Sequence, residues 1–247
     1  MISIQCLSNL NIGTSTNTGD IDQENRRIIS FLKKICIDSE LVVLNGDTFN
    51  LSVSKDWNVC ANEYIDLLKL RFNVIDFIID KILLGKIKYV VGDRDWVIRE
   101  CNLLPMVERK LSLKYDGVSI IVEHGHYPDM MDFKSGIIGW PLSKVIMGIE
   151  SLFLRDFDIK TARLLDMYPP QMECSKEAYR KYAHKLARSG KSNIVVLGHS
   201  NIPDNNRNKE CAYVNTGTPE TAGKYINVAT ILISKGKYSV SQSLVNV

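Results

Sequence analysis

The sequence predicts an α/β protein in which two β-sheets pack together and helices cover their outer faces. Three observations lead to this fold class. Apolar, β-branched runs alternate with amphipathic helical segments in the first half of the chain, as in sheets that helices cover. Runs typical of antiparallel hairpins end the chain, and the pattern between residues 128 and 191 is helical without a strand. We therefore expect a single domain over residues 1–247, with a helical cap inserted at residues 128–191.

The composition is that of an ordinary globular protein. Of the 247 residues, 45% are hydrophobic and 24% are charged, and the formal net charge is +3. This charge is too small to indicate nucleic-acid binding. The six cysteines are scattered without a Cys-x-x-Cys pair, which argues against a disulfide framework. No apolar run reaches the roughly 18 residues of a membrane span. Because Met1 leads directly into an apolar strand, we expect a cytoplasmic protein without a signal peptide.

Hydrophobic periodicity defines the elements of the first half. Short apolar runs bounded by polar residues predict strands, and apolar residues at helical spacing predict helices. A polar side chain just before an amphipathic segment is a typical helix N-cap. The expected elements, in order, are a strand at 2–7, a helix capped by Asp20 or Asp22, a strand at 41–44, one or two helices over 57–84, a strand at 88–91 and a short helix over 96–103.

The second half contains the clearest hairpin signal. Asp116-Gly117 lies between two apolar runs, which is the pattern of a tight two-residue β-turn. Pro169-Pro170 divides the helical block, and Ser175 is expected to cap its last helix at 176–188. Strands are expected at 111–115, 118–122, 193–197, 211–215, 226–233 and 238–243, with the last turn at Gly236 and Lys237.

Five of the expected strands end in polar turns, and each of these turns contains a glycine. Ligands of α/β sheets bind outside the carboxyl ends of the strands, so these turns are expected to converge. Asp, His and Asn side chains are oxygen and imidazole ligands suited to Mn, Fe or Zn. Gly46-Asp47 alone would be equally consistent with an ordinary turn. The five turns are Ser8–Gly13, Gly46–Asn50, Gly92–Asp95, Glu123–His126 and Gly198–Asn201.

In this order, the motifs resemble those of the calcineurin-like metallophosphoesterases. The resemblance covers nearly the whole chain and implies a four-layer αββα sandwich with a two-metal site at the strand ends. Arg94 in the third motif and the long helical insertion are most similar to the UDP-2,3-diacylglucosamine hydrolase branch of the family. In that branch, the enzyme cleaves a pyrophosphate bond and a helical cap holds acyl chains.

The resemblance also assigns metal ligands, and one of the two sites departs from the family pattern. The second metal site is complete, whereas the three positions exclusive to the first site are amides, which bind divalent cations more weakly than carboxylates or imidazoles. We therefore expect at most one divalent metal (Mn, Fe or Zn), or none. The second site maps to Asp47, Asp93, His124 and His199, and the degenerate first site to Asn9, Asn11 and Asn201, with Asp47 shared.

Loss of one metal predicts loss of most catalysis, because a metal pair stabilises both the attacking and the leaving oxygen. The first functional hypothesis is a non-catalytic or weakly catalytic descendant that acts as a binding or assembly protein. The alternative is a one-metal phosphoesterase or pyrophosphohydrolase acting on a phosphodiester or nucleotide-lipid substrate. The resemblance places Arg94 and Asp95 at catalytic positions, and Arg94 either binds a phosphate or pairs with Asp93 or Asp95.

The cap carries an unusually apolar stripe, with Trp140, Ile146, Ile149 and Phe153 as its proposed anchors. This stripe is a lipid-binding surface, a protein interface or the core of the insertion itself. If it is a contact surface, the partner is a protein or a membrane, and the protein is peripherally membrane-associated. The sequence leaves the oligomeric state open.

Overall fold

The computed structural model describes residues 1–14, 20–51, 57–100, 102–125, 169–200, 202–209, 211–217 and 225–246. The elements, in chain order, are β1 (Ile2–Leu7), α1 (Ile21–Asp38), β2 (Leu41–Asn45), α2 (Trp57–Leu83), β3 (Ile87–Val90), α3 (Trp96–Glu100), β4 (Val107–Glu108), β5 (Lys110–Tyr115), β6 (Val118–Glu123), α7 (Pro169–Gly190), β7 (Ile194–Leu197), β8 (Asp204–Arg207), β9 (Ala212–Asn215), β10 (Tyr225–Ser234) and β11 (Lys237–Asn246).

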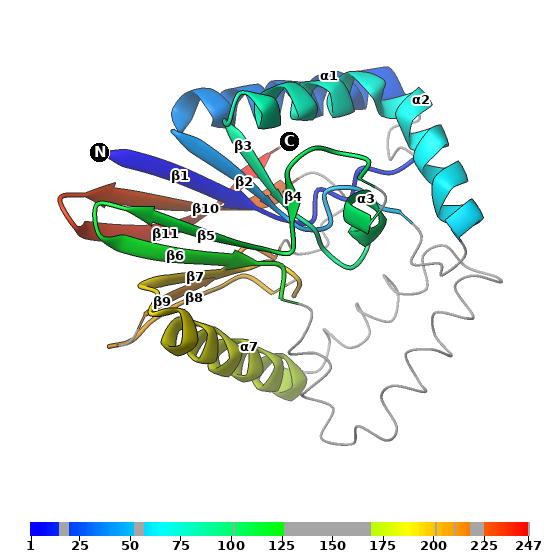
Figure 1. Ribbon diagram of the computed structural model, residues 1–247. Coiled ribbons are helices and arrows are strands. Elements are labelled where there is room, and N and C mark those ends of the chain that lie inside the picture. Colours follow the sequence, from blue (N-terminus) through cyan, green and yellow to red (C-terminus); the bar gives the residue numbers. More distant parts are fainter. Residues whose placement is uncertain are drawn as a thin grey trace.

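Two sheets form the centre of the molecule. The first has the strand order β11-β10-β1-β2-β3-β4, and the second has the order β5-β6-β7-β9-β8. Helices α1 and α2 lie on the outer side of the first sheet, and α7 lies on the outer side of the second (Figure 1). The described residues therefore form four layers, helix–sheet–sheet–helix, which confirms the predicted fold class.

Parallel pairing brings the polar turns to one edge of each sheet. β1, β2 and β3 run parallel in the first sheet, and β6, β7 and β9 run parallel in the second. Because parallel strands have their carboxyl ends at the same edge, the loops after β1, β2 and β3 meet those after β6 and β7.

The core between the sheets is apolar and consists of alternate strand residues. Cys6, Val43, Val122 and Val196 are fully buried there, and burial of such side chains contributes about 25 cal/mol per Å². The opposite faces of the same strands pack against the helices. Leu44 contacts the α1 and α2 side. Strands buried on both faces explain why their sequences are continuous apolar runs rather than alternating ones.

Helix α1 begins where the sequence predicted. Asp20 is its N-cap, and its carboxylate accepts a hydrogen bond from the Gln23 backbone N–H at 2.9 Å. Helix α2 is kinked at Arg71, where φ is −120° and ψ is 18°. The sequence left open whether this segment forms one helix or two, and the structure shows two helical stretches joined at Arg71.

Several boundaries differ from the sequence-based expectations. Helix α7 begins at Pro169, so the prediction of a separate helix capped by Ser175 was wrong. Proline is favoured in the first turn of a helix, where its missing N–H has no partner in any case. Strand β3 begins one residue earlier than expected, and the last turn is at Lys235-Gly236, where both φ angles are positive. The Asp116-Gly117 hairpin is confirmed, with φ of 46° and 79°.

Two strands had no signal in the sequence. β4 has two residues, and β8 reads Asp-Asn-Asn-Arg, without the apolar alternation that predicts a strand. Both lie at sheet edges. The part of the cap at residues 128–168, including the four proposed anchors, lies outside the described residues, and none of the described helices is long and apolar enough to span a membrane.

Candidate metal centre

The loops after β1 and β2 run side by side. The Asn9 N–H donates to the Gly46 carbonyl at 3.1 Å, and the Asn11 N–H donates to the Asp47 carbonyl at 2.9 Å. Asn9, Asn11 and Asp47 have φ angles of 57°, 48° and 51°. Asn and Asp tolerate this left-handed conformation better than other residues with a side chain. The sequence thus folds here into a strained pair of loops, a type of backbone that clusters at functional sites.

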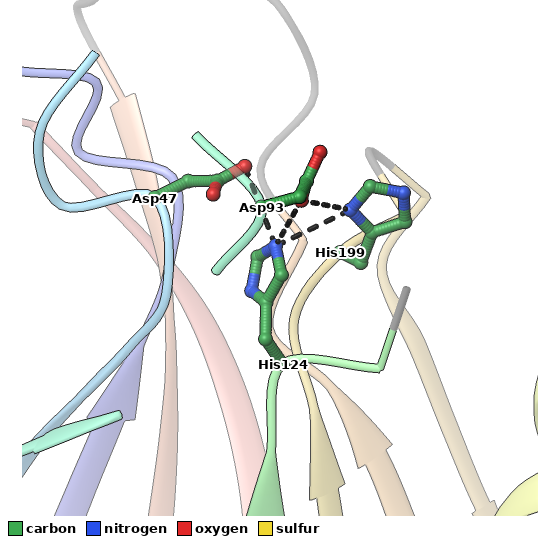
Figure 2. A group of neighbouring side chains, drawn as sticks. All are labelled: Asp47, Asp93, His124 and His199. Carbon is green, nitrogen blue, oxygen red and sulfur yellow. Dashed lines mark hydrogen bonds and ion pairs between the residues drawn. The ribbon is translucent and has the colours of Figure 1, made fainter. Parts of the chain in front are cut away.

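Four side chains converge at this edge of the sandwich. Asp47 follows β2, Asp93 follows β3, His124 follows β6 and His199 follows β7, and all four point toward one another (Figure 2). One potential ligand atom from each lies within 4.8 Å of the other three. Asp47 and His124 are buried, whereas Asp93 and His199 are partly exposed. The four residues proposed from the sequence as metal ligands are therefore brought together.

Four distances between the donor atoms are close to the spacing of ligands around one small cation. His124 Nε2 lies 3.3 Å from Asp47 Oδ2 and 3.2 Å from Asp93 Oδ1. His199 Nδ1 lies 2.9 Å from the same Asp93 oxygen and 3.2 Å from His124 Nε2. Ligands bound tetrahedrally at about 2.0–2.1 Å lie about 3.3 Å apart. Two carboxylates and two imidazoles also suit Mn, Fe or Zn, so the residues present fit a single divalent metal.

The orientation of His124 is fixed by the strand beside it. Its Nδ1 lies 2.8 Å from the carbonyl oxygen of Asn45. Because a carbonyl only accepts, Nδ1 carries the proton and Nε2 faces the carboxylates, an arrangement common for metal-binding histidines. Gly46 allows this approach, because a Cβ at that position would overlap the His124 ring.

Electrostatics within the cluster favours ion pairs in the metal-free protein. Burial lowers the pKa of His124, but the carboxylates of Asp47 and Asp93 outweigh it and raise that pKa well above its usual value. Burial opposes ionisation of Asp93, but His199 and His124 hold its pKa well below the usual range. A metal ion would take over the role of the proton on His124 and neutralise both carboxylates.

Two of the three amides that the sequence resemblance assigns to the first metal site lie beside the Asp47 loop. Asn9 and Asn11 lie in the loop hydrogen-bonded to the Asp47 loop. The Asn11 side chain is exposed and its Nδ2 donates to the Asn9 carbonyl at 3.3 Å. The third amide of this set, Asn201, lies outside the described residues.

The two residues predicted to be catalytic differ in their surroundings. The Arg94 guanidinium donates to Asn50 Oδ1 at 3.2 Å, and its Nε lies 4.0 Å from Asp47 Oδ2. Asp95 is fully buried, and both of its oxygens accept hydrogen bonds from the surrounding protein. Burial, followed by the charge of Asp47, raises the pKa of Asp95 to about 6.

Sequence reasoning missed two contributors to this site. Asn45 orients His124 through its backbone carbonyl, and the Tyr89 hydroxyl donates to Asp95 at 2.6 Å. A backbone carbonyl has no signature in the sequence. Tyr89 did have a signal, because it places a hydroxyl in the strand that leads into the third motif.

Comparisons with known proteins identify similar solved structures but no sequence family. Neither the protein-family models nor the curated proteins contain a match to this chain. A conserved uncharacterised protein of Streptococcus pneumoniae, described as a predicted phosphoesterase, has 13% identity and a TM-score of 0.47, and the match covers 98% of this chain and 88% of that protein.

Two further structures are similar to the same extent. Vps29 of Entamoeba histolytica in complex with Zn²⁺ has 12% identity and a TM-score of 0.45, with 99% of each chain covered. Yfce, a phosphoesterase from E. coli, has 11% identity and a TM-score of 0.44, with 98% of each chain covered. At these identities and TM-scores, the similarities carry no function over to this chain.

Proposed function

We propose that this chain is a metallophosphoesterase-like protein that holds one divalent metal ion and hydrolyses phosphodiesters weakly or not at all. In this view it acts as a binding or assembly protein. The observation that carries the metal site is the convergence of Asp47, Asp93, His124 and His199, whose ligand atoms lie within 4.8 Å of one another. Such a site would supply a Lewis acid able to polarise a phosphoryl oxygen.

Weak catalysis is inferred from the composition of the neighbouring position. Asn9 and Asn11 approach Asp47 along the adjacent loop, and both offer only neutral amide oxygens. A second divalent ion would be bound weakly there, because charged or imidazole ligands are absent from these two positions. Single electrostatic contributions to a transition state are each worth several kcal/mol, so loss of one metal would lower the rate by orders of magnitude.

Metal stoichiometry tests this proposal directly. The purified chain is dialysed against Mn²⁺ or Zn²⁺ and its metal content is measured by mass spectrometry. We expect at most one tightly held ion per chain. His199→Ala should lower the affinity for this ion, whereas the control variant His184→Ala, which removes an imidazole on α7, should leave it unchanged. Two tightly bound ions per wild-type chain would overturn the assignment.

A one-metal phosphoesterase is the second candidate. The fixed orientation of His124 by the Asn45 carbonyl supports it, because a preorganised ligand of this kind is typical of working metal sites. Generic phosphodiester and nucleotide-pyrophosphate substrates are offered to the Mn²⁺-loaded protein. Turnover that His199→Ala abolishes and His184→Ala preserves would favour hydrolysis over a purely binding role.

We further propose that the apolar stripe of the cap contacts a protein or lipid partner through Trp140, Ile146, Ile149 and Phe153. This proposal rests on the sequence of residues 137–154, whose apolar content exceeds what a small helical excursion needs. The double variant Ile146→Asp and Phe153→Asp should lose the contact and keep the sandwich folded. Unfolding of the whole domain would instead show that the stripe is core.

A further inference from the structure

Asp95 lies at the centre of a buried hydrogen-bond network next to the candidate metal centre. Its Oδ1 accepts from the Gly92 backbone N–H at 2.6 Å. Its Oδ2 accepts from the Thr48 backbone N–H at 2.8 Å and from the Tyr89 hydroxyl at 2.6 Å, and the Phe49 N–H lies at 3.5 Å from the same oxygen. The side chain is fully buried, so its hydrogen-bonding capacity is directed into the protein rather than toward a substrate.

The backbone donors belong to the two loops that carry the candidate carboxylate ligands. Thr48 directly follows Asp47, and Gly92 directly precedes Asp93. One carboxylate therefore links the loop after β2 to the loop after β3. The loops are also in direct contact, because a Cβ on Gly92 would overlap the Asp47 carboxylate and lie 2.6 Å from its backbone nitrogen.

We propose, on the basis of the metal-binding function proposed above, that Asp95 is a positioning residue which, together with Tyr89, holds Asp47 and Asp93 at metal-binding separation. It acts through backbone hydrogen bonds to the two loops and does not touch the ion. This role differs from the catalytic role that the sequence resemblance assigns to Asp95. Tyr89 contributes from β3, where its ring packs against Phe49 with a centroid distance of 6.4 Å.

Substitution of Asp95 or Tyr89 is therefore predicted to weaken metal binding. Groups that orient metal ligands without contacting the metal typically account for about 10–100-fold in affinity. Asp95→Asn replaces one acceptor oxygen by an amide donor, which then faces a backbone N–H. Tyr89→Phe is milder, because it removes a single hydroxyl and keeps the aromatic ring.

The experiment compares three variants by calorimetric titration with Mn²⁺ or Zn²⁺. Tyr238→Phe is the matched control, since it removes a hydroxyl that donates to Asn193 at 3.3 Å at the start of β7, far along the strand from the metal centre. We expect Kd to rise about tenfold for Tyr89→Phe and up to about 100-fold for Asp95→Asn. Kd for Tyr238→Phe should stay within about twofold of the wild type. Equal Kd values for Tyr89→Phe and Tyr238→Phe would overturn the proposal.

Hydrogen exchange provides a readout that needs no metal. In the presence of chelator, the amide hydrogens of Thr48 and Gly92 should exchange faster in Asp95→Asn and Tyr89→Phe than in Tyr238→Phe. Unchanged protection at both amides would refute the link between the loops even if the wild type binds metal. If the wild type binds no metal, the proposed function fails, while the exchange measurement still decides whether Asp95 joins the two loops. Should Asp95→Asn not fold, Tyr89→Phe carries the test.

Discussion

The buried guanidinium of Arg71 is expected to be a major source of stability, and Arg71→Met tests this. Arg71 is fully buried at the break in α2. Its Nε donates to the Gly13 carbonyl at 2.8 Å, one terminal nitrogen donates to Asn25 Oδ1 at 2.8 Å, and the other pairs with Glu24 at 3.0 Å. One side chain thus ties α2 to α1 and to the loop after β1. Methionine keeps the apolar stem and removes only the charged group.

The expected loss of stability in Arg71→Met depends on the surroundings in which each former partner of the guanidinium is left. Glu24 has 24% of its side chain exposed and regains water, which limits its cost. The buried Asn25 side chain and the Gly13 carbonyl each lose a charged hydrogen-bond donor. Hydrogen bonds to charged groups contribute about 1.5–3 kcal/mol each, and these contributions are not additive. Removing one partner of a buried ion pair typically costs about 3–5 kcal/mol. In a domain of this size, that loss would lower the melting temperature by roughly 6–20 °C.

Thermal and urea unfolding followed by circular dichroism measure this effect. Lys69→Met is the control, because Lys69 lies on the same helix but pairs with Asp66 at an exposed position, with 69% and 60% of the two side chains accessible. Exposed pairs of this kind contribute little, so the control should change the free energy of unfolding by less than about 0.5 kcal/mol. If Arg71→Met costs no more than the control, the buried network does not stabilise the fold as reasoned here.

Three further predictions concern the metal centre. The combined variant Asn9→Asp, Asn11→His and Asn201→His should bind a second metal ion and gain phosphodiesterase activity. A metal content unchanged from the wild type would show that the loop conformation, and not only the ligand side chains, prevents binding of a second ion. Metal binding at neutral pH should release about one proton, because the carboxylates near His124 raise its pKa despite burial. The apparent affinity should therefore rise about tenfold per pH unit below that pKa, and titration heats that do not depend on the buffer would contradict this. Gly92→Ala should abolish metal binding, because its Cβ overlaps the carboxylate after β2, and a wild-type Kd in this variant would be the opposing result.

The central strands and the convergence of the four candidate ligands were predictable because their signals are local. A buried parallel strand is a continuous apolar run. β2 (Leu41–Asn45) begins with four apolar residues and is followed at once by Gly-Asp. Parallel order then places successive strand ends together, so the convergence of the turns follows from topology. The positions of Asp47 and His199 could therefore be inferred from motif order alone.

Other features depend on contacts between distant residues and left no pattern in the sequence. β8 forms because Asp204–Arg207 pairs with the edge of β9, not because its own residues favour a strand. Arg71, at the break in α2, donates hydrogen bonds to partners in α1 and in the loop after β1 that lie far away in the chain. Asp95 was assigned to chemistry from its motif, whereas its hydrogen bonds reach back to Thr48 and depend on how two loops pack.

The distribution of the ligands between the sheets has a consequence for how the protein withstands unfolding. Both carboxylates follow strands of the first sheet, and both imidazoles follow strands of the second. A bound ion would therefore add a cross-link between two layers whose shared core is apolar. An ion at 100 times its dissociation constant adds about 2.7 kcal/mol to the free energy of unfolding. Resistance to heat and proteolysis would then report the free metal concentration of the compartment in which the protein resides.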